Sequence, residues 1–172
     1  MKALELEIAQ LIREYQATTG KCLSIGTVES ATGGRIADRI TNVAGSSDYF
    51  KGSILAYSNE VKIKVVGLNK ETIENHGAVS AQTAIEMAQG GRKLLNVDIC
   101  ISDSGIAGPS GNSQGKPVGL FYLGLAAWHE TSSQEHIFSG NREKNKQDAT
   151  EASLSMLKQY LLQHQAGGKV II

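Results

Sequence analysis

The sequence predicts an α/β protein built as a single three-layer domain, in which a central mixed, mostly parallel sheet is flanked by helices. Three observations lead to this fold class. Helical and strand-like patterns alternate along most of the 172 residues. The segments 22–29 and 97–102 are short apolar runs of the kind that forms buried strands. The region 118–138 has the pattern of a hairpin, so part of the sheet is expected to be antiparallel.

The amino-terminal part is predicted to alternate helix and strand twice. Apolar residues at helical spacing predict a helix from residue 4 to 15, and Gly20 follows as a stop signal. A strand is expected at 22–29, a helix with its apolar face at 36–43, and a second strand at 52–57.

The middle of the chain is predicted to be helical. Asn59 is a plausible cap for a short helix through Val66, and Gly67 ends it. A second short helix is expected at 69–77. Ser80 is a plausible cap for a longer helix that ends at Leu95.

The carboxyl-terminal part completes the predicted sheet and closes with a helix. The expected elements are, in order, a buried strand at 97–102, a loop at 105–117, a long strand at 118–128, a turn at 131–134, a short strand at 136–138 and a helix at 142–164. Gly167-Gly168 indicates a flexible tail.

One domain is expected over residues 1–172, with its core at about 20–164 and a flexible tail at 165–172. No apolar run is long enough to span a bilayer, and the partly acidic, amphipathic first ten residues are not typical of a signal peptide. Cys22 and Cys100 lie in apolar, strand-like contexts, which favours two buried thiols in a reducing compartment. These features predict a cytoplasmic protein.

Charge and histidine spacing narrow the function classes. Lys plus Arg and Asp plus Glu both number 17, and this zero net charge argues against nucleic-acid binding driven by bulk electrostatics, although a local basic patch is compatible with it. None of the four histidines has metal-ligand spacing to a cysteine or carboxylate. We therefore expect no bound metal, no cofactor, no nucleic-acid partner and no membrane partner.

Two segments with small polar residues, at the ends of predicted strands or helices, are candidate sites for binding or catalysis. Ser30-Ala31-Thr32-Gly33-Gly34 follows a strand and enters a helix, so its backbone N–H groups suit either a tight turn with a helix cap or a site for a phosphate or carboxylate. Gly45-Ser46-Ser47 suits a cap for a short helix, and a serine there is also a candidate nucleophile if a base lies nearby.

Two further segments carry groups for proton transfer and charge stabilisation. Tyr57 ends a predicted strand and Lys62 lies one turn into the next helix, which suits either a solvated lysine or a buried base with a tyrosine relay. The loop 104–111, closed by Lys116-Pro117, is either a flexible connection or a source of N–H donors for an oxyanion.

In this order and spacing the segments resemble the C-terminal domain of the competence-damage-inducible protein CinA and its stand-alone relatives. The resemblance covers about residues 23–162. The stretches that carry it are 28–34, 44–47, 57–62, 76–80, 104–109, 116–119 and 138–142.

The resemblance implies a metal-independent deamidase that converts nicotinamide mononucleotide to nicotinic acid mononucleotide and ammonia. It implies Ser47 as nucleophile, with Tyr57 and Lys62 handling protons. Further matching positions that line the site are Ser30, Thr32, Gly33, Gly34, Ser104, Gly105, Gly108 and Arg142. The resemblance also implies a homodimer or higher homo-oligomer, and longer members with an additional N-terminal domain that this sequence is not expected to contain.

Two positions depart from the family pattern. Asp103 stands where relatives usually have an apolar residue or threonine, so its carboxylate is expected either to face outward at a strand end or to disturb the pocket. Ser110-Gly111-Asn112 lacks the acidic residue and the glycine pair common in relatives. The alternatives are a nucleotide-binding or regulatory member without activity, and an accessory protein in DNA uptake or repair, which the balanced charge disfavours.

Overall fold

The fold is known from a computed structural model that describes residues 3–111 and 115–166. Five strands form one sheet in the order β2-β1-β3-β4-β5. They are β1 (Ile25–Glu29), β2 (Phe50–Leu55), β3 (Ile99–Gly105), β4 (Leu120–Ala126) and β5 (Thr131–Ile137). β1 pairs in parallel with both β2 and β3, whereas β3–β4 and β4–β5 are antiparallel. The mixed α/β sheet is confirmed, and its pairings are evenly divided between the two directions.

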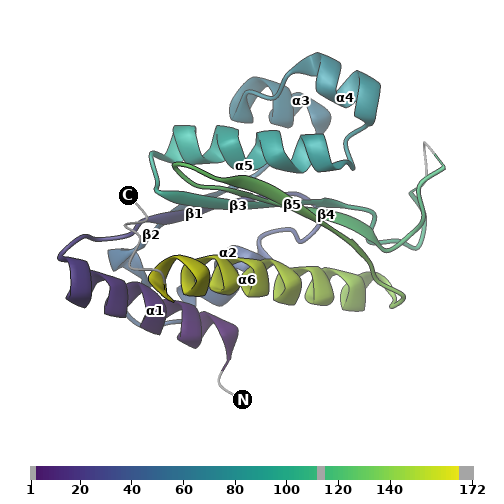
Figure 1. Cartoon of the computed structure of the whole chain (residues 1–172). Coiled ribbons are helices and arrows are strands. Elements are labelled where there is room, and N and C mark those ends of the chain that lie inside the picture. The colour runs from purple at the N-terminus through teal and green to yellow at the C-terminus, as the bar shows by residue number, and fades with distance from the viewer. Residues whose placement is uncertain (1–2, 112–114, 167–172) are drawn as a thin grey trace.

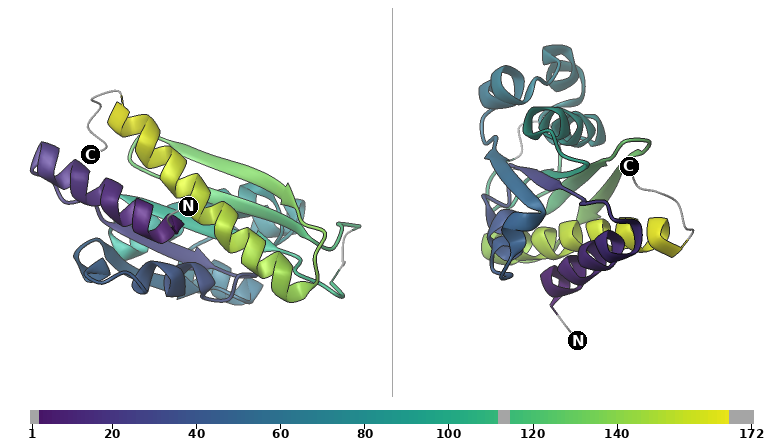
Figure 2. Two further views of the ribbon diagram at one scale, coloured as in Figure 1. Left: turned by 90° about the horizontal axis from the view of Figure 1, so that it is seen from below. Right: turned by 90° about the vertical axis from the view of Figure 1, so that its left-hand side faces the viewer.

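Helices cover both faces of the sheet and complete the three layers (Figure 1). On one face lies α5 (Ala81–Leu95), and α3 (Asn59–Val61) and α4 (Lys70–His76) lie beyond it. The other face carries α1 (Leu4–Thr19), α2 (Arg35–Thr41) and α6 (Arg142–Ala166). Figure 2 shows α1 and α6 side by side beneath the sheet, and the two helices are in contact.

Two short elements are tighter or wider than an α-helix. A single 3₁₀ turn, η1 (Ser46–Asp48), precedes β2, and a π-helical turn, η2 (Lys62–Val66), continues α3. Gly67, at φ 85°, ends this helical segment as expected. Its cap differs from the prediction, because the Ser58 side chain accepts the Val61 N–H at 3.2 Å.

The core has one apolar cluster on each side of the sheet. The larger includes Ile8, Ile12 and Tyr15 of α1, so the core begins before residue 20, where it was predicted to start. The smaller joins Met87 of α5 to Val28 and to the segment around Val66. Helix α6 continues through Ala166, into the predicted tail, and residues 167–172 lie outside the described part.

Several predicted boundaries need correction. The segment Thr131–Ile137 is a strand and not a turn, because pairing with β4 satisfies its backbone groups despite its polar composition. β2 ends at Leu55, so Tyr57 lies outside the sheet. Cys100 is buried as predicted, but Cys22 is exposed. No helix among residues 3–111 and 115–166 is long and apolar enough to cross a membrane.

Candidate functional site

A cavity of about 230 Å³ lies where the three parallel strands end. Ser30 follows β1, Tyr57 follows β2, and Ser104 stands at the end of β3. Because the carboxyl ends of parallel strands meet at one edge of a sheet, residues far apart in sequence converge here. The complete lining is Ser30, Ala31, Tyr57, Asn59, Lys62, Ala78, Val79, Ser104, Gly105, Ala107 and Arg142.

Lys62 points its amine at the hydroxyl of Ser30. The Nζ–Oγ distance is 3.0 Å, and the side chain of Lys62 is only 2% exposed. The same nitrogen donates to the carbonyl oxygens of Ala56 at 2.9 Å and Tyr57 at 3.3 Å. A neutral amine has two hydrogens and one lone pair, so these carbonyls can hold both hydrogens while the lone pair faces the Ser30 hydroxyl.

Burial acts on the charge of Lys62. Loss of solvation lowers the pKa of the ammonium, and the carboxylate of Asp103 acts in the opposite direction. A lysine with a lowered pKa has a larger neutral fraction near neutral pH, so more of it is available to accept a proton. Burial is the largest cause of this shift, as the interpretation of Lys62 as a buried base expects.

The turn after β1 does not offer its N–H groups to a ligand in the way its composition predicts. Glu29, fully buried, accepts hydrogen bonds from the N–H groups of Gly34, Ile36 and Ala37 at 2.8, 3.1 and 2.8 Å. The N–H groups of Ser30 and Thr32 bond to Asp103. The protein's own carboxylates therefore occupy three N–H groups of the expected anion site at residues 30–34, and two more in the first turn of α2. Gly33 lies beside Lys146, and Thr32, Gly33 and Gly34 are not among the cavity-lining residues.

The Asp103 side chain points into the protein, and it is not among the residues that line the cavity. It is fully buried on β3, and burial, its largest perturbation, raises its pKa to about 6. Its carboxylate receives N–H bonds from Ser30 at 3.0 Å and Thr32 at 3.1 Å. The backbone that carries Ser30 is thus attached to a neighbouring strand.

Tyr57 and Arg142 form the outer rim. Tyr57 is 62% exposed, and its hydroxyl lies 3.2 Å from Nη2 of Arg142. Arg142, the first residue of α6, also donates from Nη1 to the carbonyl of Gly108 at 2.8 Å. The Tyr57 carbonyl contacts Lys62 but its phenol contacts Arg142, so the structure gives no support to the predicted tyrosine relay.

The loop after β3 forms the opposite wall. The Ser104 hydroxyl donates to the carbonyl of Ala78 at 2.5 Å. Gly105 allows close packing, because a Cβ at this position would lie 2.3 Å from the Phe121 ring. Gly108 has φ +89°, a conformation that glycine adopts without strain, and its carbonyl orients Arg142.

Ser47 lies at the other end of β2. It belongs to η1, which precedes Phe50, and Phe50 pairs with the first residue of β1. A strand of this length spans about 20 Å. The structure therefore does not bring Ser47 to Lys62 within one chain. The serine that the Lys62 amine does face is Ser30.

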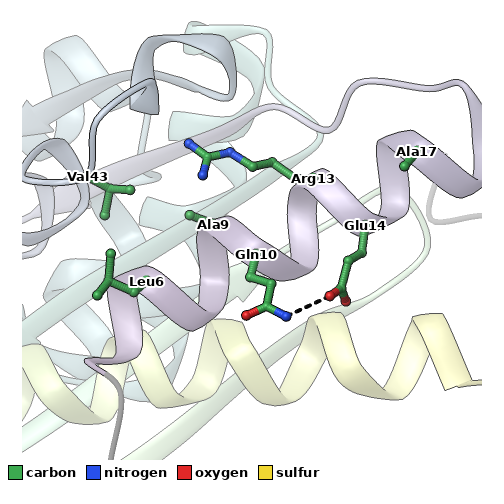
Figure 3. Close-up of a pocket in the computed structure, with 7 residues that line it drawn as sticks. All are labelled: Leu6, Ala9, Gln10, Arg13, Glu14, Ala17 and Val43. Atoms are coloured by element: carbon green, nitrogen blue, oxygen red, sulfur yellow. Dashed lines mark hydrogen bonds between the residues drawn. The ribbon is translucent and has the colours of Figure 1, made fainter.

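A second hollow of about 500 Å³ lies along α1. Figure 3 shows that its wall is formed by one helix face together with Val43, and that Gln10 donates to Glu14. Aliphatic side chains contribute much of this wall, and none of its lining residues is one that the sequence singles out for chemistry. The cavity at Lys62 is therefore the candidate active site.

Comparisons of the sequence with known proteins identify its family. The profile of the CinA C-terminal domain family matches residues 5–161. The chain belongs to the CinA C-terminal domain family. A putative competence-damage inducible protein of Halothermothrix orenii is 50% identical over 148 residues, covering 83% of this chain and 36% of that protein. A CinA-like protein of Sulfurihydrogenibium sp. is 42% identical over 161 residues, covering 92% and 39%. The chain thus spans less than two fifths of the length of these two curated relatives.

Solved structures of the family share the fold. A CinA superfamily protein from Enterobacter cloacae has a TM-score of 0.85 at 28% identity, covering 92% of this chain and 90% of that one. A competence/damage inducible protein from Agrobacterium tumefaciens has a TM-score of 0.81 at 32% identity, covering 91% and 97%. The arrangement of strands around the cavity is therefore expected in these family members as well.

Sequence reasoning missed or misplaced several residues of this site. No role in the site is assigned from the sequence to Glu29, Ala78 or Val79, although all three lie in stretches that carry the family resemblance. Asn59, read as a cap, lines the cavity. An acidic residue at the end of an apolar strand, next to a turn of small residues, is the sequence signal that could have identified Glu29 and Asp103.

Proposed function

We propose that this protein hydrolyses the carboxamide of nicotinamide mononucleotide to give nicotinic acid mononucleotide and ammonia, with Ser30 as nucleophile and Lys62 as general base. One observation carries the proposal: a buried lysine amine, held by two carbonyl oxygens, lies 3.0 Å from a serine hydroxyl in a cavity. Serine is a weak nucleophile until an adjacent base removes its proton. The resemblance to the deamidases supplies the substrate.

The reaction proceeds in two halves. The Ser30 oxygen attacks the carboxamide carbon while its proton moves to Lys62, which forms a tetrahedral oxyanion. Lys62 then returns the proton to the nitrogen, the C–N bond breaks, and ammonia leaves an acyl-enzyme ester. A water molecule, deprotonated by Lys62, hydrolyses this ester and regenerates Ser30. We assign the N–H group of Ala31, the residue after the nucleophile, to the oxyanion.

The charge of the cavity favours this substrate class, and its size limits how much of the substrate it can enclose. Its volume of about 230 Å³ is below the roughly 300–1,000 Å³ of sites that enclose a whole small ligand. We therefore place the carboxamide ring inside and the ribose phosphate at the rim. Lys62 and Arg142 are the charged side chains among the lining residues, and Arg142 is the partner we propose for the phosphate. This replaces the phosphate site expected at residues 30–34, where the N–H groups of Ser30, Thr32 and Gly34 already bond to Asp103 and Glu29.

The test is ammonia release from nicotinamide mononucleotide by the wild type and three variants. Ser30→Ala and Lys62→Met should each lower kcat roughly 1,000-fold or more, and the double variant should be little worse, because the two residues act as one unit. Ser47→Ala is the matched control and should retain wild-type turnover, since Ser47 is exposed and distant from the cavity.

Two outcomes would contradict the assignment. Normal turnover by folded Ser30→Ala would exclude Ser30 as nucleophile, and loss of turnover in Ser47→Ala alone would return the role to Ser47. Binding of the nucleotide without ammonia release by the wild type would instead indicate a nucleotide-binding or regulatory protein. The homo-oligomer implied by the resemblance is also part of the proposal, and light scattering measures it.

A further inference from the structure

Asp103 lies beneath the turn that carries the proposed nucleophile. It is fully buried on β3, directly before Ser104, and accepts the N–H groups of Ser30 and Thr32. A buried carboxylate bonded to backbone N–H groups fixes the peptide that presents them. The direction in which the Ser30 hydroxyl projects toward Lys62 therefore depends on a side chain that does not line the cavity.

A second buried acid is connected to Asp103 through Thr32. The Thr32 hydroxyl oxygen lies 2.7 Å from Glu29 Oε2 and 2.5 Å from Asp103 Oδ1. One hydroxyl proton can be donated to only one of these carboxyl groups, so a second proton is needed when both contacts are made. Glu29 also accepts three N–H bonds at the start of α2, whereas burial raises the pKa of Asp103 to about 6. The additional proton shared by Thr32 and the two carboxyl groups is therefore carried by Asp103.

The charge of Asp103 acts on Lys62 across Ser30. The carboxylate opposes the effect of burial and favours the ammonium form of Lys62. Around Asp103, β1 contributes the acid Glu29 and η2 contributes Lys62, whereas its partner on β4 is the uncharged Leu123. From α6, the amine of Lys146 lies beside Gly33 in the same turn.

We propose that Asp103 is a positioning residue of the Ser30–Lys62 pair: its carboxyl group holds the Ser30 peptide in place, and its negative charge, when the carboxyl group is ionised, makes the Lys62 amine a stronger base. The inference rests on the proposed function for its effect on catalysis. Its effect on the charge of Lys62 is independent of which substrate the cavity accepts.

The decisive experiment titrates the Lys62 amine by NMR in lysine-labelled protein, with Lys62→Arg used to assign its signal. Asp103→Asn removes the negative charge at nearly constant size. Its Lys62 midpoint should fall by about one pH unit relative to wild type. Asp98→Asn is the matched control, because Asp98 also accepts backbone and hydroxyl bonds but lies before β3, at the opposite end of that strand. It should leave the midpoint unchanged.

Kinetics separate positioning from charge. For ammonia release from nicotinamide mononucleotide, Asp103→Asn should shift the acid limb of kcat/KM to lower pH and lower the plateau roughly 10- to 100-fold, because one N–H bond of the Ser30 turn is lost. A merely structural role would lower the amount of folded protein without moving the pH limb. If wild type releases no ammonia, the proposed function fails, while the Lys62 titration still decides the present inference.

Two results would overturn the proposal. The first is an unchanged Lys62 midpoint in folded Asp103→Asn. If that variant does not fold, Asp103→Thr removes the same charge with a side chain well suited to a strand. The Lys62 titration of the wild type alone is a second, independent measurement. In the wild type, the Lys62 signal should report a second inflection that coincides with the Asp103 carboxyl titration. Its absence would be the second contradicting result.

Discussion

Replacing Asp103 by asparagine should change the pH dependence of stability by a predictable amount. Burial raises the pKa of Asp103 from its usual 3.8 to about 6. Between these values the folded protein retains a proton that the unfolded chain has released, so the free energy of unfolding falls as pH rises. One pKa unit corresponds to about 1.4 kcal/mol, and the whole difference therefore amounts to about 3 kcal/mol. The contribution is fully present below pH 3.8 and is lost above about pH 6.

The assay is urea denaturation of wild type and Asp103→Asn, followed by far-UV circular dichroism from pH 4 to 7.5. The stability of wild type relative to the variant should fall by about 2.5 kcal/mol across this range, because part of the whole difference is already lost below pH 4. Comparing the two proteins at each pH removes most of the contribution of other acids. A difference that stays constant with pH would refute the reasoning. A relative gain of wild type with rising pH would show that the N–H groups of Ser30 and Thr32 stabilise the anion more than burial disfavours it.

Three further perturbations have expected outcomes. Thr32→Val should lower the free energy of unfolding by about 1–3 kcal/mol, because it leaves two buried carboxyl groups without their shared hydroxyl; Thr32→Ser should restore most of this in denaturant titrations. Gly105→Ala should cost about 1–3 kcal/mol by thermal unfolding, since its Cβ would meet the buried Phe121 ring, and a stable variant would contradict this packing. Ammonia release should survive EDTA, because the described residues contain no group of three His, Cys, Asp or Glu side chains able to hold a metal; reactivation by one divalent ion after inhibition would overturn this.

Much of the fold follows from patterns within short windows of sequence. Apolar spacing and local caps predict α5, where the Ser80 side chain accepts the Thr83 N–H at 3.1 Å as its composition suggests. The continuous apolar run that forms β3 is predicted for the same reason, because a strand covered on both faces needs no polar alternation.

The wrong elements are those whose stability comes from distant partners. The residues of β5 are mostly polar and partly exposed, so no window around Thr131 predicts a strand. Seven residue pairs with β4 supply the hydrogen bonds that decide its conformation. The interaction of Asp103 with the Ser30 turn is also invisible in sequence, because it joins groups 73 residues apart.

The sequence indicates which residues line the candidate site better than it indicates what each of them does. Tyr57, Lys62, Ser104 and Arg142 all line one cavity. Ser30 also belongs there, but it was read as part of a phosphate-binding wall. Composition cannot separate these two roles, since small residues before a helix suit both an anion site and a nucleophile. The contact that separates them is Lys62 with Ser30, which depends on tertiary structure.

The order of strand and turn nevertheless contains an argument that distinguishes the two serines. In a parallel sheet, residues after the strands share one edge and residues before them share the other. Ser30 and Tyr57 follow β1 and β2, whereas Ser47 precedes β2. A lysine located after β2 can therefore reach the first serine and not the second within one chain. The same edge explains the two carboxylates: Glu29 ends β1 and Asp103 lies near the end of β3, and both bond to the turn that holds Ser30. Because those acids bind the N–H groups of Ser30, Thr32 and Gly34, the proposed function gives the turn the role of a rigid support for Ser30. It leaves recognition of the substrate phosphate to Arg142, which lines the cavity.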